Sequence, residues 1–513
     1  MAEPCPRNSD DDVDAPAASP SAHRVSGRRH VERRVSLALL LFFTVARVFA
    51  DDRAEIDGLI RATLAEVHDA PGLSVAVVKD GKVIVASGYG LASIASNRPM
   101  TATTPVYIAS STKSYTGLLL ATLAQRHVLD LDVPIVNYLS ELQDWPEASR
   151  ITLRQLLTHS AGIENSGITM RTAYTGEYTS PQLIRLLRSS RSIDRAFTYD
   201  NLGYIVASLV AERVTGKKWQ DLMEELVLRP LAMRNTSDYV SRAKGALATG
   251  YLTAPDRTQA EAFMAKRDGT MHAAGGIVTT ADDLSRWLLA NITEPSPAFR
   301  EAHKLQITLT KPSDRFKVHR TGYGFGWYLA TYDGTAMLEH SGGYPGWRAH
   351  VSFLPKEKIG VAIIANNSGL GGFLPDILAA QIYDRLLGKP ASMTAHEVHK
   401  RLDNVWQQML AEREKRSKRP PTLLKPIELY AGEYENSAMG KLVIERNGDR
   451  LVARYGPLHS LIEPFTEPDS GRVEMVPDQG EVLQFTFGPE KQASSVSWGS
   501  DIFARSATPM LPR

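Results

Sequence analysis

Residues 107–117 read Tyr-Ile-Ala-Ser-Ser-Thr-Lys-Ser-Tyr-Thr-Gly, and the apolar residues after them predict a helix that continues through Leu123. Ser110 and Lys113 are three residues apart at the start of this helix, so their side chains share one face of its first turn. A serine hydroxyl is a poor nucleophile until an adjacent base takes its proton, and burial lowers the pKa of a lysine until the amine can be that base. The stretch therefore predicts a Ser110 nucleophile with Lys113 as its proton acceptor.

A second Ser-x-x-Lys match occurs at residues 241–244. Gly245 follows it at once, and no long apolar helix stands behind it. We interpret this copy as a surface loop without a catalytic role.

The segment 197–204 reads Phe-Thr-Tyr-Asp-Asn-Leu-Gly-Tyr and opens another apolar helix. It places a phenol, Tyr199, two residues before an amide, Asn201. A phenol beside a cationic lysine loses its proton more easily, and it could then exchange protons with the serine and the leaving group. A core tyrosine with a satisfied hydroxyl is the alternative for Tyr199 taken alone.

A third motif, His340-Ser341-Gly342-Gly343, lies at the end of a predicted strand. Small residues there would let a substrate lie against the strand edge, with backbone N–H groups of Gly343 and Ser110 forming an oxyanion hole. A turn explains the two glycines equally well. His159 is predicted to end a helix with a structural hydrogen bond, and a general base is the alternative.

The flanking pattern predicts an α/β fold of the α+β type. Apolar residues follow a helical period over 53–69, then β-rich runs at 73–78 and 83–86 flank an Asp-Gly turn. From 322 to 366 the period is two, beginning with Tyr323, Phe325 and Trp327 on one face, and 374–387 has a helical period. We therefore expect an antiparallel sheet flanked by helices, with a helical insert between residues 125 and 320.

The carboxy-terminal part has a different pattern. Residues 391–417 predict a charged helix, and Lys418-Arg419-Pro420-Pro421 predicts a linker. Short alternating segments follow at 441–445, 450–453, 473–476, 482–487 and 494–498. The expected organisation is a leader at 1–50, a main domain at 51–390, a helix and linker at 391–426, and a small all-β barrel-like domain at 427–513.

The amino terminus predicts export. Arg33-Arg34 precedes the apolar run 35–46, which is short for a bilayer span, and Val48-Phe49-Ala50 is an acceptable cleavage site. The paired arginines favour the twin-arginine route. We expect a periplasmic or secreted chain cut after Ala50, with no stable membrane span in its mature form; an uncleaved anchor is the alternative.

The composition excludes several classes of function and of catalytic site. The formal net charge of +2 argues against a dedicated nucleic-acid binder. The single cysteine, Cys5, lies in the predicted leader, so disulfides, Cys-ligated metals and a Cys nucleophile are excluded from the mature chain.

The three motifs, together with Leu-Leu-Thr-His-Ser-Ala-Gly at 156–162 and Gly-Gly-Ile-Val-Thr-Thr at 275–280, resemble a known family. It comprises the serine hydrolases related to class C β-lactamases, D-alanyl-D-alanine carboxypeptidases, D-amino-acid peptidases and β-lactamase-like esterases. The resemblance covers about residues 51–389, and the segment from about 430 resembles the lipocalin-like modules appended to many such hydrolases.

The resemblance implies a β-lactamase/transpeptidase-like fold and assigns roles. Ser110 would be the acylated nucleophile, Lys113 its proton acceptor and Tyr199 the partner acid and base. Asn201 would bind a substrate amide and Lys113, and the segment 340–342 would be the third-strand edge. Class C β-lactamases begin the third motif with a lysine that helps to hold the β-lactam carboxylate, whereas His340 is largely neutral near pH 7.

We therefore expect an exported serine hydrolase that cleaves an amide bond of a short peptide through a Ser110 acyl-enzyme, without a metal or organic cofactor. Peptides with D-residues and linearised cyclic peptides are candidate substrates. A carboxylic-ester hydrolase or a β-lactamase is one alternative. A penicillin- or peptide-binding protein that is acylated without turnover is the other.

Overall fold

The computed structural model describes residues 50–175, 179–243, 246–263, 266–270, 272–477 and 479–506. The predicted export signal up to residue 49 lies outside this part of the chain. Residues 50–66 form a helix, and residues 52–513 make up one compact unit. Within the described residues, no helix is both long and apolar enough to span a bilayer.

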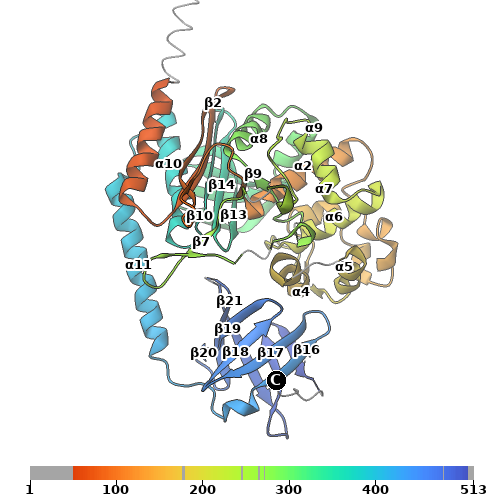
Figure 1. The fold of residues 1–513 in the computed structure, drawn as a ribbon. Coiled ribbons are helices and arrows are strands. Elements are labelled where there is room, and N and C mark those ends of the chain that lie inside the picture. The colour runs from red at the N-terminus through yellow and green to blue at the C-terminus, as the bar shows by residue number, and fades with distance from the viewer. Residues whose placement is uncertain are drawn as a thin grey trace, which may run out of the picture. The chain divides into compact units, whose positions relative to one another are not determined.

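The main sheet is antiparallel and has nine strands (Figure 1). In spatial order these are β10 (Ile307–Arg315), β11 (Val318–Tyr323), β12 (Tyr328–Tyr332), β13 (Thr335–Tyr344), β14 (Trp347–Leu354), β15 (Ile359–Ala365), β1 (Gly72–Lys79), β2 (Lys82–Ser93) and β3 (Arg98–Pro99). In the middle of the sheet, β15 pairs with β1, from Leu73 opposite Ala365 to Lys79 opposite Ile359. Segments far apart in sequence thus complete one sheet, which confirms the predicted fold class.

Local sequence explains one hairpin and misleads at another turn. Asp80 and Gly81 both have positive φ, 49° and 75°, as a two-residue turn between β1 and β2 requires. The predicted strand through Phe325 and Trp327 is wrong, because β11 ends at Tyr323 and the Gly324 N–H donates to the Trp327 carbonyl across 2.8 Å. Both aromatic side chains are buried although they lie in a turn.

Helices cover both faces of the sheet. On one face α8 (Ala281–Thr293) packs on β1, β2, β14 and β15. Its N-terminus is capped by Thr280, whose side chain accepts from the Asp283 N–H. On the other face lies α10 (Leu374–Leu386), whose Tyr383 hydroxyl is 2.8 Å from the Ser352 hydroxyl of β14.

The helical insert lies beside the sheet (Figure 1). It follows α2 (Thr112–Gln125), and its helices beside the sheet are α3 (Leu153–Leu157), α4 (Ser166–Met170), α5 (Ser180–Leu187), α6 (Leu202–Thr215), α7 (Trp219–Met223) and α9 (Pro297–His303). Its central contact joins α3 and α6 closely, because a Cβ on Gly203 would lie 2.3 Å from the Leu156 carbonyl oxygen. Short strands β4 (Val106–Tyr107) and β9 (Val278–Thr279) pair just before α2 and α8.

The carboxy-terminal part begins with α11 (Ala395–Ser417), which Thr394 and Glu397 start with a capping box. A second nine-stranded antiparallel sheet follows, with β19 and β21 in contact, so that it is nearly closed into a barrel. Its strands are, in spatial order, β19 (Leu458–Leu461), β18 (Arg450–Tyr455), β17 (Gly440–Asn447), β16 (Gly432–Asn436), β24 (Asp501–Arg505), β23 (Ala493–Trp498), β22 (Gln479–Phe487), β21 (Ser470–Val476) and β20 (Glu463–Pro464). This confirms the predicted barrel-like module.

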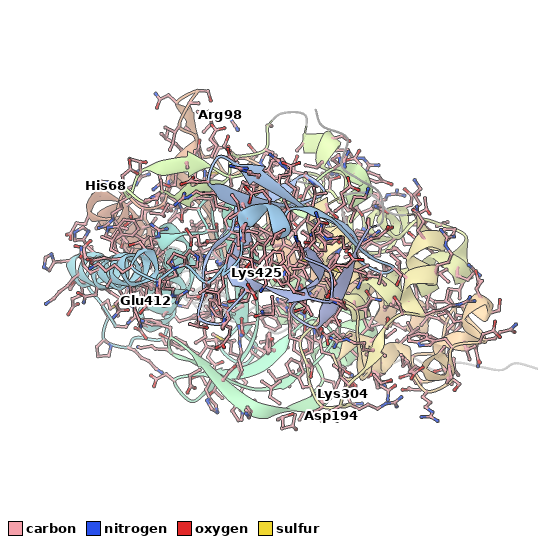
Figure 2. All side chains as sticks on the ribbon, turned by 90° about the horizontal axis from the view of Figure 1, so that it is seen from below. His68, Arg98, Asp194, Lys304, Glu412 and Lys425 are labelled. Carbon is pink, nitrogen blue, oxygen red and sulfur yellow. The ribbon has the colours of Figure 1, made fainter. Side chains whose placement is uncertain are left out.

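Charged side chains of both signs cover the surface, among them Asp194, Lys304 and Glu412 (Figure 2). This even mixture accords with the chain's 59 basic and 57 acidic residues.

Candidate active site

The predicted nucleophile lies in a tight turn. Residues Ala109–Ser111 form a 3₁₀ turn that leads into α2, and Ala109 has a φ of 46°. A left-handed non-glycine residue costs about 1–3 kcal/mol, so surrounding contacts must hold the turn. One of them is the Ser111 hydroxyl, which donates to the His340 carbonyl across 3.1 Å. The turn thereby fixes Ser110 beside β13.

Lys113 lies one turn further along and is fully buried. Its Nζ is 3.3 Å from Ser110 Oγ, and it donates to Asn201 Oδ1 at 2.7 Å and to the Ala274 carbonyl at 2.9 Å. Burial lowers the pKa of Lys113 to about 7; nearby Asp200 opposes this shift and nearby Lys266 adds to it. The amine is therefore partly neutral at neutral pH, as a proton acceptor for Ser110 must be.

Tyr199 stands over the same amine. The Lys113 Nζ is 4.9 Å from the centroid of the Tyr199 ring. Although 39% of the Tyr199 surface is exposed, burial raises the pKa of the phenol, and a hydrogen bond with Ser110 only partly offsets this. The expected loss of the phenol proton beside a lysine is thus wrong for the resting site, because the cation faces the ring and desolvation outweighs it.

His159 and His340 belong to one chain of hydrogen bonds. The Asp200 N–H donates to His159 Nδ1 at 3.1 Å, so Nε2 carries the proton and donates to the Tyr323 hydroxyl at 3.3 Å. That hydroxyl donates to His340 Nε2 at 3.1 Å, and His340 Nδ1–H donates to the Ser341 carbonyl at 2.8 Å.

Burial, with Lys113 nearby, holds the pKa values of both imidazoles well below their usual range, so both are neutral. Each imidazole therefore keeps one fixed donor and one fixed acceptor. This series of hydrogen bonds connects the turn that carries Tyr199 to the edge of β13. His159 therefore has the structural role predicted for it.

Consecutive residues of the predicted strand edge face opposite sides of the sheet. The backbone of Gly342 approaches the nucleophile turn, since a Cβ there would lie 2.0 Å from the Ile108 carbonyl oxygen. The Ser341 hydroxyl points the other way and accepts from Arg315 Nη1 at 2.5 Å. Gly343 lies directly opposite Arg348 of β14.

Sequence reasoning missed three contributors to the site. Tyr323 bridges the two histidines, and the Ala274 carbonyl holds Lys113. Lys266 is buried with its Nζ 5.3 Å from the Tyr344 ring, and burial lowers its pKa to about 7. Only the Gly275-Gly276 pair after Ala274 gave a local signal. Tyr323 and Lys266 reach the site through tertiary packing alone.

Comparisons with known proteins agree with this geometry. The unguisins hydrolase ungD' of Aspergillus campestris is 29% identical over 441 residues, which cover 77% of this chain and 78% of that protein. The octameric penicillin-binding protein homologue of Pyrococcus abyssi has a similar fold, with a TM-score of 0.56 and 21% identity over 88% of this chain and 99% of that one. The D-amino acid amidase of Ochrobactrum anthropi also has a TM-score of 0.56, with 20% identity over 66% of this chain and 99% of that one.

A family model described as Beta-lactamase matches residues 56–382. This range holds the main sheet, the helical insert and all three motifs. The chain therefore belongs to the Beta-lactamase family and is a serine hydrolase.

Proposed function

We propose that this protein hydrolyses an amide bond of a short peptide, with D- or otherwise unusual residues, through an acyl-enzyme on Ser110. The observation that carries the proposal is the buried Lys113 amine, 3.3 Å from Ser110 Oγ, with a pKa of about 7. The similarity to an unguisins hydrolase and the fold shared with a D-amino acid amidase support a peptide-like substrate.

The proposed acylation begins with neutral Lys113, which takes the Ser110 proton as Oγ bonds to the substrate carbonyl carbon. Backbone N–H groups of Ser110 and Gly343 are the proposed donors to the oxyanion. Because Tyr199 keeps its proton in the resting site, it donates to the leaving nitrogen as the C–N bond breaks, and Lys113 returns a proton to the phenolate. In deacylation, a water molecule attacks the ester carbonyl and gives a proton to neutral Lys113. As the C–Oγ bond breaks, Lys113 returns that proton to Ser110 Oγ, and the acid product leaves.

Two alternatives use the same residues. A carboxylic-ester hydrolase or β-lactamase would also form an acyl-enzyme on Ser110, from an ester carbonyl or a β-lactam carbonyl. A penicillin- or peptide-binding protein would stop at the adduct. Neutral His340 favours a peptide substrate over a β-lactam, because it supplies no positive charge to a β-lactam carboxylate at that position.

We further propose that the protein is exported, periplasmic or secreted, after removal of about residues 1–50. The charged segment ending in Arg33-Arg34, the apolar run and the small residues before Asp51 support this. Mass spectrometry of the amino terminus of secreted protein would test it, and an intact residue 1 in the exported fraction would refute cleavage.

The first prediction concerns Ser110. Ser110→Ala should lower kcat/KM by at least about 10³-fold for any substrate that wild type turns over, because the nucleophile is lost. Release of product is measured from an N-acetyl-D-alanine p-nitroanilide, a p-nitrophenyl ester and a chromogenic cephalosporin. Ser241→Ala is the matched control, since Ser241 is exposed and bonded to Asp268.

Each outcome assigns the function differently. Equal rates in wild type and Ser110→Ala would refute the nucleophile. Ester-only turnover would favour the esterase, and cephalosporin-only turnover the β-lactamase. A stable adduct on Ser110 without product release would favour the binding protein.

A further inference from the structure

The end of the catalytic strand β13 needs support from outside the main sheet. The pairing of β12 with β13 ends where Tyr328 meets Glu339, so β13 extends beyond this neighbour from His340 onward. On its other side the same stretch pairs with β14. A free strand edge offers backbone N–H and C=O groups to a ligand, but it lacks the hydrogen bonds that would fix its position. Side chains must therefore hold residues 340–344.

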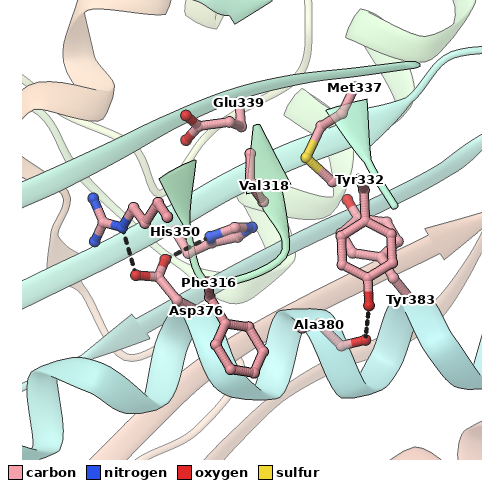
Figure 3. A pocket seen from close by; sticks show the side chains of 10 residues that line it. Phe316, Val318, Tyr332, Met337, Glu339, His350, Asp376, Ala380 and Tyr383 are labelled. Atoms are coloured by element: carbon pink, nitrogen blue, oxygen red, sulfur yellow. Dashed lines mark hydrogen bonds and ion pairs between the residues drawn. The ribbon is translucent and has the colours of Figure 1, made fainter. Parts of the chain in front are cut away.

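A polar cluster holds the middle of this edge. The Ser341 hydroxyl accepts from Arg315 Nη1 at 2.5 Å. Arg315 is in turn bound to Asp376 of α10, with Nε 2.6 Å from Oδ2, and the other carboxylate oxygen of Asp376 is 2.8 Å from His350 Nδ1 (Figure 3). Each of these side chains has its partner within the cluster, and together they tie Ser341 to α10. The end of the strand is held by different contacts.

Three tyrosine rings meet at the end of the strand. Tyr344 directly follows Gly343, and its ring stacks on that of Tyr174 with centroids 5.5 Å apart and planes 9° apart. The Tyr107 ring stands edge-on to Tyr344, with a centroid distance of 5.3 Å and an angle of 80°. Tyr107 precedes Ser110 by three residues. Since Ser110 and Gly343 are the proposed oxyanion donors, the rings join the two segments that carry these donors.

The segment that carries Tyr174 has an unusual conformation. Helix α4 continues directly into a single π-helical turn, Arg171–Thr175. Such turns are rare and occur frequently at functional sites. Tyr174 packs against the core of the main domain and also against the core of the barrel. Burial raises the pKa of its phenol, and a hydrogen bond with Gln479 of β22 opposes this shift. One ring is therefore shared by the two domains.

The barrel grips the π-helical turn with the connection between β16 and β17. Asn436 Oδ1 accepts from the N–H groups of Ala438 and Met439, both at 2.8 Å, which folds this connection into a tight turn. The Met439 carbonyl accepts from Arg171 Nε at 3.0 Å. A Cβ on Gly440 would lie 2.2 Å from Arg171 Nη2, so the two segments are in close contact.

The first turn of α4 is tied to the barrel as well, and α4 reaches a second catalytic motif. The Ser166 hydroxyl donates to the Asp501 carboxylate at the start of β24. Thr169 Oγ1 is 3.5 Å from Asp200 Oδ1, at the long limit of a hydrogen bond. Asp200 directly follows Tyr199. The segment 166–175 thus lies between the barrel and two of the three motifs.

The interior of the barrel is filled by its own side chains. Its core includes Tyr434, Phe485 and Trp498, all of which are buried. Such packing stabilises the module itself. The contacts with segment 166–175 come from a turn and from the start of β24.

We propose that the barrel is a positioning module of this hydrolase, and that Tyr174 is the positioning residue through which it acts. The turn 436–440 holds the π-helical turn, the Tyr174 ring then packs against Tyr344, and Tyr344 fixes the backbone of Gly343 beside Ser110. A misplacement of about 1 Å can cost on the order of 10²-fold in rate. The inference rests on the oxyanion donors of the proposed function, and it holds for a peptide, ester or β-lactam substrate alike.

Gly440→Ala tests the grip of the barrel, with Gly448→Ala as its matched control. Both glycines have positive φ, 83° and 63°, so alanine strains the backbone at either position. A Cβ on Gly440 meets Arg171, whereas one on Gly448 meets no described atom within 4 Å. Hydrogen–deuterium exchange, measured by mass spectrometry, should become about tenfold faster in residues 166–175 and 340–344 of Gly440→Ala only. Exchange that matches wild type in both segments would overturn the proposal.

The reaction of Ser110 with a fluorophosphonate probe tests Tyr174. Ser110 Oγ displaces fluoride from phosphorus and its proton passes to Lys113, so labelling depends on the nucleophile and the oxyanion donors and not on the natural substrate. Tyr174→Leu should lower the first-order rate constant of labelling by about tenfold and leave the half-saturating probe concentration nearly unchanged, because the donors are misplaced. Tyr174→Phe keeps the ring and should stay within about twofold of wild type.

Arg171→Ala tests the same contact from the other side of the interface. It removes the donor to the Met439 carbonyl and should slow labelling as Tyr174→Leu does, whereas Arg185→Ala, exposed on α5, should not. Equal labelling rates in wild type, Tyr174→Leu and Arg171→Ala, at wild-type melting temperature, would overturn the positioning role. Labelling that persists in Ser110→Ala would instead refute the proposed nucleophile, and the exchange experiment would still decide whether the barrel holds residues 340–344.

Discussion

At the residue scale, Lys113 sets the protonation state of the active site. Its amine touches the nucleophile, an amide oxygen and a backbone carbonyl, and none of these is an anion. Because burial is not offset by a carboxylate in contact, the charged form is disfavoured and the pKa falls to about 7. The same lysine in water would be protonated at every physiological pH.

This predicts a pH dependence. If neutral Lys113 is the base, kcat/KM should rise about tenfold per pH unit below pH 7 and level off above it, because only the deprotonated amine can accept the Ser110 proton. The measurement is a pH profile of kcat/KM from pH 5 to 9. Lys113→Ala should lose about 10²–10⁴-fold at pH 8. A wild-type profile that is flat across pH 7 would contradict the assignment.

Tyr199 illustrates why chemistry cannot be inferred from neighbours in sequence alone. A cation nearby in space is expected to lower its pKa, yet the Lys113 amine lies over the ring face and burial raises the pKa of the phenol. The sign of the shift followed from orientation and burial, which the sequence does not encode locally. The phenol is better suited to donate a proton than to accept one.

At the scale of elements, the contact between β13 and the nucleophile turn positions the site. Gly342 and Ile108 touch through their backbones, and Ser111 bonds the His340 carbonyl. The positive φ of Ala109 is tolerated because these contacts hold the turn from the strand side. Strand and helix therefore act as one unit.

Gly342→Ala tests this contact. A Cβ placed 2.0 Å from the Ile108 carbonyl oxygen must push the strand and the turn apart, and a displacement of about 1 Å can cost on the order of 10²-fold in rate. We expect kcat to fall by about that factor while the protein remains folded, as measured by turnover and circular dichroism. Gly58→Ala is the control, because nothing lies within 4 Å of a Cβ there. Equal activity of both variants would show that the turn does not depend on the strand.

At the scale of the whole molecule, Arg257 joins three distant segments. Its guanidinium binds Asp69 through Nε and Nη2, both at 2.9 Å, and Asp403 of α11 through Nη1 at 2.5 Å. The Asp69 side chain is only 4% exposed, whereas that of Asp403 is 39% exposed. The pairing with Asp69 is thus the one that solvent cannot replace.

Arg257→Ala should lower the free energy of unfolding by about 1–3 kcal/mol, because it leaves a buried carboxylate without its counter-charge. Asp403→Ala should cost less than about 1 kcal/mol, since exposed ion pairs contribute little. Urea unfolding followed by tryptophan fluorescence measures both. Equal losses in the two variants would show that the α11 contact, and not the buried pair, carries the stability.

Much of the fold could be predicted from local patterns. Alternation and turn chemistry located β1, β2, β14, β15 and most strands of the barrel, and the charged stretch 391–417 located α11. The turn through Phe325 and Trp327 was predicted as a strand because both side chains are buried and only one residue separates them. Any such pair of buried residues matches the alternating pattern of a strand, whatever the backbone conformation. The spacing of apolar residues indicates which side chains are buried. Only the backbone hydrogen bonds distinguish a strand from a turn.

The sequence by itself determined the reactive groups, since a Ser-x-x-Lys at a helix start, a Tyr-x-Asn and a His-Ser-Gly-Gly impose their spacing through local backbone geometry. Tertiary structure alone decided their electrostatics. The depth of burial of Lys113 and the Tyr323 bridge between His159 and His340 come from segments that are distant in sequence. Proton affinity depends on desolvation and on the distance between charges, and both are set by how the chain packs.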